Sequence, residues 1–432
     1  MHHLALNLPD IMVKLFRGSF ERKKPDKVEQ WPWAVFHPID DDSAWINHSE
    51  AVADMRFYIP RSFGKAPRNI AAKMNSGFKA WEHMYHFYMV LPGQLWGVLN
   101  DELFEHYCKL VAGCHFALML ETPVALRLLA HKLLVEFVED FERLYYARQL
   151  DRLHFCRHSI HLLVHLIPEG VRRGPLWLFS QWEAALYVMF PVLAKPEGLP
   201  KDAVVLGDDY GRVLASAPRG RHERAALLSF LHAHDVAVPE GWELGLWKWA
   251  RLQLPNGQIT RMAFGECKRE ARNVPIRRAC MVKARGLHMF GPFILIHLNP
   301  PAAWRHFAEV LYFFRMTMTG ADGQDETRVL AMVSEFTLPD PTIAKDTHNV
   351  LMVCYSQGAH PPRVVDVKDV VSVVAMMPLG PRPCEAHEPD AERRYADHYY
   401  VWEKLGCDMA WIGRGDNPNY EEEEEDENWL IL

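Results

Sequence analysis

Apolar residues recur at intervals of three and four along residues 78–193, and they alternate with polar residues in much of the chain that follows. The first pattern predicts amphipathic helices, because residues three or four apart share one helix face. Gly93 and Gly97 interrupt the first helical stretch, and Asp101 is placed to cap the helix DELFEHYCKLVAGCHFALML. This part of the chain is therefore expected to form a helical domain.

Proline and glycine predict where the later helices begin and end. Thr122 is placed to cap a helix whose first turn holds Pro123, a position at which the missing N–H costs nothing. A histidine-rich helix follows, and Pro168 and Gly170 are expected to end it. One more helix is expected over residues 176–193.

The period of the apolar pattern changes after Val192. Residues 194–240 are rich in proline, glycine and aspartate, which predicts a linker with one short helix over residues 223–234. The segment WKWARLQLPNGQITRMAF alternates about Asn256-Gly257, a strong hairpin signal. Further strands are predicted at AEVLYFFRM, RVLAMVSEF, NVLMVCYS, RVVDVKDVVSVVAMM and HYYVWEK.

These assignments predict an α+β fold class, in which a helical N-terminal half is followed by a small antiparallel β-barrel or sandwich domain. Five units are expected along the chain: an irregular N-terminal segment (1–77), the helical domain (78–193), the linker (194–240), a β-rich domain (241–410) and an acidic disordered tail (411–432).

Composition narrows the class of protein. The chain has 432 residues, of which 49% are hydrophobic, enough for a sizeable core. Its eight cysteines include no C-x-x-C pair, which disfavours a zinc ribbon and a secreted disulfide framework. The N-terminus lacks the features of a signal peptide, and no apolar run approaches the ~20 residues of a membrane span. An intracellular protein that does not bind membranes is expected.

Charge is unevenly placed along the chain, whose net charge is −7. The string EEEEEDE at residues 421–427 accounts for this excess. Basic residues gather between Arg261 and Arg285, a local cluster that contacts with phosphate would need and that a solvated, strongly charged strand and loop would equally show. The candidate DNA-binding residues are Lys268, Arg269, Arg272, Arg277, Arg278, Lys283 and Arg285.

The string LHFCRHSIHLLVHL at residues 153–166 places four histidines at intervals of four, three and four. On one helix these intervals keep the imidazoles in a single stripe. A zinc site is one interpretation, but neither i,i+4 pair encloses the glutamate of an H-E-x-x-H motif. Hydrogen-bonded structural histidines are the alternative that we expect. The weak metal candidates are His154, His158, His161 and His165.

Several long strings resemble the later part of the CACTA-type (En/Spm-like) transposases of mushroom-forming fungi. In chain order they are MHHLALNLPDIMVKLFRGSF, MNSGFKAWEHMYHFYMVLPGQLWGVL, FVEDFERLYYARQLDRLHFCRHSIHLLVHLIPEGVRRGPLWLFSQW, WARLQLPNGQ, FAEVLYFF and VVDVKDVVSVVAMMPL. The resemblance covers nearly the whole chain. It implies a nuclear protein whose helical half is the remnant of an RNase H-like enzyme. The implied partner is DNA or another transposase subunit, and no small-molecule substrate is inferred.

This chain differs from that family at the positions of the catalytic acids. The family enzyme cuts DNA with three carboxylates that hold two divalent ions, usually Mg²⁺. The second acid belongs to a D-x-M-H string, of which this chain has only Met1 and His2. The third, a Glu, follows a Q-W pair by three residues, where this chain has Ala185, and Glu183 directly follows the pair. His2 and Glu183 are therefore weak catalytic candidates, and Mg²⁺ is implied only for the intact family enzyme.

Three hypotheses about function follow. The first, which we expect, is a transposase-derived and non-catalytic fragment that still binds DNA or a transposase subunit. The string LHMFGPFILIHLNPPAAW, which looks inserted before FAEVLYFF, supports the interpretation of a rearranged copy. The second is a metal-dependent DNA transposase or nuclease whose gene model is incomplete, and the third is a His-based metalloprotein.

Overall fold

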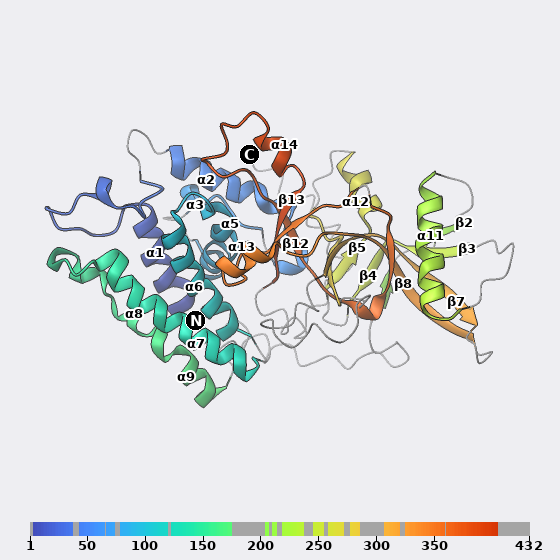
Figure 1. Cartoon of the computed structure of the whole chain (residues 1–432), viewed down its shortest axis with the longest axis horizontal. Helices are drawn as coiled ribbons and strands as arrows, with labels where there is room; N and C mark the ends of the chain where they lie inside the picture. The colour runs from blue at the N-terminus through green and yellow to red at the C-terminus, as the bar shows by residue number, and fades with distance from the viewer. Residues whose placement is uncertain are drawn as a thin grey trace.

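The computed structural model describes residues 3–37, 43–64, 66–73, 78–119, 122–174, 204–206, 210–213, 218–236, 245–254, 258–271, 277–285, 306–319, 325–358 and 360–404. Five features named above lie outside these residues: the helix expected over 176–193, the turn Asn256-Gly257, the string at 287–304, the acidic tail and the side chains of His2, Glu183 and Arg272. The helices of residues 3–173 gather on one side of the molecule, and most of the strands lie on the other (Figure 1). The α+β class is thereby confirmed.

The N-terminal segment contains well-formed helices, so the expectation of an irregular segment over residues 1–77 is wrong for its described part. α1 (Leu8–Phe16) buries Leu8, Met12 and Leu15 completely. Their spacing of four and three residues is that of one helix face. A helix of nine residues is too short to give a long periodic signal, which is why the pattern alone does not predict it.

α6 (Asp101–Ala117) and α7 (Val124–Phe141) pack against each other at the centre of the helical half. The N-cap of α6 is Asn100 and not Asp101, because the Asn100 side chain accepts a hydrogen bond from the backbone N–H of Leu103 at 2.9 Å. Asp101 instead occupies the first turn, where a negative charge suits the helix dipole.

The start of α7 also differs from the expectation. Pro123 is the N-cap, outside the first turn, and the Thr122 hydroxyl donates to the carbonyl of Phe116 at 3.1 Å rather than capping the helix. The other helices of this half are η1 (His3–Asn7), η2 (Val28–Gln30), α2 (Ser43–Asp54), η3 (Met55–Phe57), η4 (Arg61–Phe63), α3 (Ile70–Lys73), α4 (Ala80–Tyr85), η5 (His86–Val90), α5 (Leu91–Leu95) and η6 (Glu142–Tyr146).

The histidine-rich segment is not one helix, contrary to the expectation from its spacing. It divides into η7 (Leu150–Phe155), α8 (His158–His161) and α9 (Leu163–Arg173). The ψ angle of 73° at Cys156 lies outside the helical range and ends η7. α9 continues past Pro168 and Gly170, where an end was expected, because burial of Leu163 and Ile167 offsets the hydrogen bond that Pro168 cannot donate.

The described strands form three antiparallel sheets, and none of these sheets closes into a barrel. The sheets have the strand orders β1-β4-β5, β10-β8-β7-β3-β2 with β6 and β11 attached through β7, and β12-β13-β9. Their bounds are β1 (Val204–Leu206), β2 (Tyr210–Val213), β3 (Gly245–Trp249), β4 (Arg251–Gln253), β5 (Ile259–Arg261), β6 (Met281–Ala284), β7 (His306–Thr319), β8 (Asp325–Glu335), β9 (Val353–Tyr355), β10 (Arg363–Asp366), β11 (Val370–Val373), β12 (Ala375–Pro378) and β13 (His398–Trp402).

Every strand string predicted from the sequence contains strand, and β4 pairs with β5 as the hairpin signal requires. Residues 194–240 are more than the expected linker, because β1 is a strand of one sheet and β2 is a strand of another. The helix in this region begins at Pro218, earlier than expected. The helices of the C-terminal half are α11 (Pro218–Ala233), α12 (Ala263–Glu270), α13 (Pro341–Asp346), η10 (Val367–Asp369) and α14 (Ala391–Tyr395).

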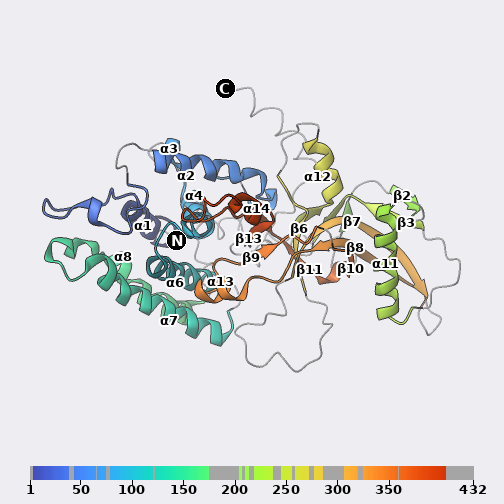
Figure 2. The same cartoon turned by 45° about the horizontal axis from the view of Figure 1, so that its top comes forward.

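The largest sheet is covered on both faces. Phe230 of α11 packs on Phe314 and Met332 of β7 and β8, and α11 lies across these strands in both ribbon views (Figure 2). On the other face, Leu252 of β4 packs with Phe313. Alternating side chains of one strand therefore belong to two separate apolar clusters, as the period of two in a β-strand requires.

The third sheet, β12-β13-β9, completes the core of the helical half. Met377, Tyr400 and Trp402 are buried in the same apolar cluster as the side chains of α1, α6 and α7. A Cβ atom built on Gly93 of α5 would lie 2.3 Å from the Tyr400 ring, so the glycine allows this close approach. The helical and β-rich parts of the sequence are thus not two separate cores.

Candidate functional site

The basic segment does not form one continuous surface, because several of its arginines are used inside the molecule. Arg277 donates from Nε to the carbonyl of Ile59 at 2.8 Å and from Nη2 to the carbonyl of Pro60 at 2.9 Å. The backbone N–H of Arg278 donates to the carbonyl of Phe57 at 2.9 Å. These bonds tie the segment before β6 to the η3–η4 region of the helical half.

Other members of the segment are paired with acids or spread out. The Arg278 guanidinium lies 3.5 Å from the Glu270 carboxylate, and Lys283 forms an ion pair with Glu403 at 2.6 Å. Arg285 lies at the end of β6, where its backbone N–H donates to a carbonyl of η10. The sequence correctly finds a basic segment, but it does not show which charges are neutralised within the fold.

α12 presents two cations of the segment to solvent. Lys268 and Arg269 are exposed in its last turn, and their side chains form no ion pair with any described residue. Phe264, one turn before Lys268 on the same helix, is 66% exposed. α12 stands on the outside of the molecule in both ribbon views, and Phe264 and Lys268, four residues apart, share one exposed side of it (Figures 1 and 2).

Buried Glu266 ties α12 to the segment before β6. Glu266 is 4% exposed, and its Oε1 accepts the backbone N–H of Ala279 at 2.8 Å. The Cys280 thiol donates to Glu309 Oε1 at 3.8 Å. Burial raises the pKa of Glu266 and of Glu309, and it raises the pKa of the Cys280 thiol well above its usual value. Burial therefore disfavours the thiolate of Cys280, the form in which a cysteine acts as a nucleophile.

The four stripe histidines are divided among η7, α8 and α9 and have different partners. His154 donates from Nε2 to the carbonyl of Glu21 at 2.5 Å, which is the structural role expected of it. His161 and His165 lie one turn apart with their Nε2 atoms 3.3 Å from each other. The ring of His158 lies 6.4 Å from that of His161, so it does not join this contact.

A buried histidine pair was not found by sequence reasoning. His48 of α2 and His86 of η5 are joined by an Nε2–Nε2 hydrogen bond of 2.9 Å, and the His48 ring lies 4.6 Å from that of Phe36. Burial lowers the pKa of His48 to about 4 and that of His86 well below its usual value. No signal could have revealed the pair, because the two residues are 38 positions apart and follow no shared motif.

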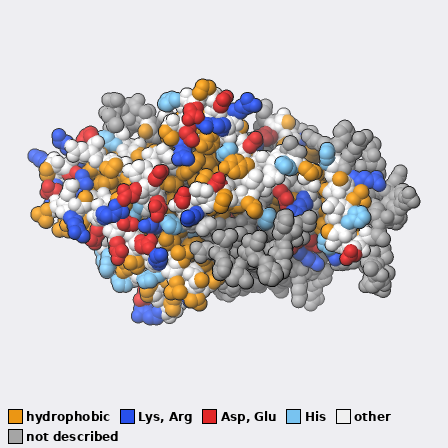
Figure 3. All heavy atoms as spheres, in the orientation of Figure 1, with side chains coloured by type: hydrophobic (Ala, Val, Ile, Leu, Met, Phe, Trp, Pro, Cys, Tyr) orange, Lys and Arg blue, Asp and Glu red, His pale blue; other side chains and the backbone are white. Residues whose placement is uncertain are grey.

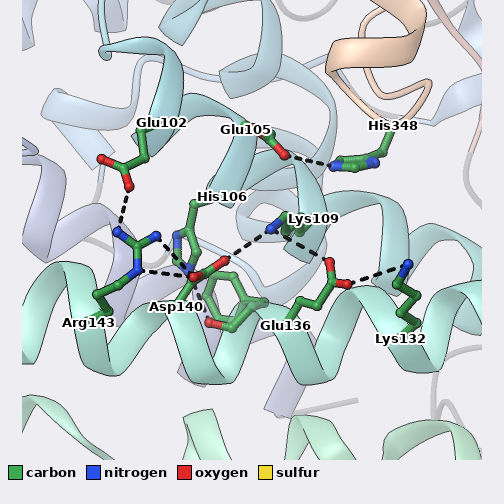
Figure 4. A network of polar contacts seen from close by, with 10 residues as sticks. Glu102, Glu105, His106, Lys109, Lys132, Glu136, Asp140, Arg143 and His348 are labelled. Carbon is green, nitrogen blue, oxygen red and sulfur yellow. Dashed lines mark hydrogen bonds and ion pairs between the residues drawn. The ribbon is translucent and has the colours of Figure 1, made fainter.

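A network of opposite charges joins α6 to α7 (Figure 4). Lys109, only 14% exposed, lies 3.0 Å from Asp140 and 3.6 Å from Glu136, while Arg143 pairs with Asp140 and Glu102. Burial opposes ionisation of Asp140, but the hydrogen bonds from Lys109 and Arg143 outweigh it and lower its pKa. Each acid in the network has a basic partner, so the arrangement favours a structural role over divalent-ion binding.

Within the described residues, no three His, Cys, Asp or Glu side chains converge as ligands for one metal ion. Among the helices that the structure describes, none is both long and apolar enough to cross a membrane. No protein-family model, curated protein or solved structure matches the chain. Lys268 and Arg269 of α12 are exposed members of the basic segment identified in the sequence.

Proposed function

We propose that this chain is a transposase-derived, non-catalytic protein that binds the DNA backbone through α12. The transposase part of the proposal is supported by the strings that resemble the family and follow its order along nearly the whole chain. The non-catalytic part is supported by Ala185, which stands where the family pattern places the third acid, a Glu.

The observation that supports DNA contact is the exposure of Lys268, Arg269 and Phe264 on one short helix, with Phe264 and Lys268 one turn apart. Phosphate contacts from lysine and arginine release counterions from DNA, which makes such binding strongly dependent on salt. An exposed aromatic ring next to cations also suits stacking on the bases of single-stranded nucleic acid. On the face shown in Figure 3, acidic and basic side chains are interspersed over the helical half.

The test is fluorescence anisotropy with labelled duplex DNA over a range of salt concentrations. The double variant K268Q/R269Q is expected to bind more weakly, and the slope of log K against log salt should fall by about 0.9 for each phosphate that the variant no longer neutralises. K345Q/R393Q is the matched control, because Lys345 and Arg393 are likewise exposed in the last turns of helices. F264A is expected to weaken binding to single strands more than to duplex.

Equal weakening in both double variants, or no binding by the unmodified chain at low salt, would overturn the α12 assignment. The same samples incubated with Mg²⁺ and supercoiled plasmid test the non-catalytic part. Metal-dependent nicking by the purified chain that disappears in E183A would show that the nuclease alternative is correct.

A further inference from the structure

The stripe histidines include two pairs whose members are four residues apart, His154/His158 and His161/His165. Only the second pair lies on a nearly continuous helix. His161 ends α8 and His165 lies in the first turn of α9, with Leu162 between the helices in right-handed helical conformation. Their imidazoles therefore project from adjacent turns of one face, as residues at i and i+4 do. Both side chains are exposed to solvent.

The distance between the two rings is that of two ligands on one metal ion. Zinc–nitrogen bonds of about 2.0–2.1 Å at a tetrahedral angle place two ligand nitrogens roughly 3.3–3.4 Å apart. The Nε2 atoms of His161 and His165 are 3.3 Å apart. As a hydrogen bond this is long, and it leaves both imidazoles able to turn their nitrogen lone pairs toward a shared ion.

We propose that His161 and His165 form a two-histidine site for a borderline divalent transition-metal ion, Zn²⁺ or Cu²⁺. The proposal is independent of the function proposed above. Imidazole is a favoured ligand of both ions, and water completes the coordination. Glu169, the next residue on this face, does not provide a third ligand, because its carboxylate is paired with Arg172 at 2.7 Å and Arg173 at 2.9 Å. The site is therefore open, and the ion that it binds is exchangeable.

His154 and His158 provide a matched control within the same segment. They have the same spacing of four residues, but Cys156 and Arg157 leave the helical conformation between them. His154 is turned toward the carbonyl of Glu21, with its ring stacked 6.1 Å from that of Phe20. This pair shares the sequence pattern of the proposed site and lacks its geometry.

The experiment is isothermal titration of the full chain with ZnCl₂ and, separately, CuCl₂ in a buffer that does not bind metal. We expect one site that weakens at least tenfold in H161A and in H165A and is unchanged in H158A. With Cu²⁺, the electron paramagnetic resonance spectrum should show coupling to two nitrogens in the unmodified chain and to fewer in H165A. Binding should also weaken as the pH falls, because protons compete for the imidazole nitrogens.

The variants are expected to fold, because the substituted side chains are exposed, and circular dichroism checks this directly. Equal affinity and stoichiometry in the unmodified chain and H161A would overturn the proposal. Weakening in H158A as large as that in H161A would overturn it as well, because sequence spacing rather than the observed geometry would then determine binding.

Discussion

At the scale of single residues, Asp26 and Arg152 form the best-connected buried ion pair in the helical half. Arg152 donates from Nε and Nη2 to both carboxylate oxygens, at 2.9 and 2.7 Å, and Trp31 donates its indole N–H to the same carboxylate. The guanidinium lies 5.4 Å from the centre of the Trp33 ring. Two distant segments, 126 residues apart, are joined in this way.

Removing the Asp26 carboxylate should destabilise the protein strongly, because the Arg152 charge would stay buried without a partner. We expect D26A to lower the free energy of unfolding by about 3–5 kcal/mol in chemical denaturation. D10A is the control: the Asp10–Lys14 pair is about half exposed, and its loss should cost about 1 kcal/mol or less. Similar effects of the two variants would contradict the role assigned to the buried pair.

Buried histidines predict how stability depends on pH. Burial lowers the pKa of His106 from 6.5 to about 4, although its Nε2 donates to the carbonyl of Phe137. The unfolded chain then binds a proton more readily than the folded one, so this contribution is complete above pH 6.5 and is lost as the pH falls toward 4. One such histidine should cost about 2 kcal/mol of stability at pH 5. In H106Q, the difference in unfolding free energy between pH 7 and pH 5 should shrink by about this amount, and an unchanged difference would contradict the assignment.

At the scale of elements, the packing of α6 on α7 depends on a glycine that the apolar pattern does not single out. A Cβ atom built on Gly113 would lie 2.6 Å from Cγ of Leu134, which is fully buried and has no room to move. Glycine inside a helix normally lowers stability relative to alanine. At Gly113 the intrinsic preference of a helix for alanine over glycine is opposed by the close contact between α6 and α7, which leaves no space for a Cβ atom.

We therefore expect alanine to have opposite effects at two helical glycines. G113A should destabilise by about 1–3 kcal/mol, because overpacking forces α6 and α7 apart. G265A in α12 should stabilise by about 0.5–1 kcal/mol, because the nearest atom to its added Cβ, on Met262, is 3.5 Å away. Thermal unfolding of both variants measures the two signs, and stabilisation by G113A would show that the helices can separate without cost.

Elements are also where the sequence is most informative. A short apolar run bounded by turn residues correctly predicted strands such as AEVLYFFRM, which lies in β7, because a strand buried on both faces selects apolar residues over its whole length. Helix ends were less predictable, since Asn100 and Asp101 are both suitable caps and only the backbone geometry distinguishes them. The candidate site was likewise only partly predictable. The sequence shows the basic segment, but it does not show the partners of Arg277 and Lys283, which are far away along the chain.

At the scale of the whole molecule, the order of elements along the chain does not show which elements share a hydrophobic core. The pattern predicted a helical unit and a separate β-rich unit. The structure instead places sheet β12-β13-β9 in the core of the helical half, with Met377, Tyr400 and Trp402 buried there. Periodicity reports which side of a strand is buried and contains no information on the element that buries it. This is why the strands were predicted correctly and their partner was not.

Because the core is shared, a destabilising substitution in β13 is expected to lower the local stability of the helices as well. W402A should lower the free energy of unfolding by about 3–5 kcal/mol, as loss of a buried tryptophan does, and amides of α1 and α6 should exchange hydrogen faster. F314A removes an equally buried ring from the cluster beneath α11, so faster exchange should be confined to α11, β7 and β8. Hydrogen exchange followed by mass spectrometry distinguishes the two patterns. Unchanged protection of α1 and α6 in W402A would mean that the helical half is stable without the C-terminal sheet, and that the sequence-based division into two units was right after all.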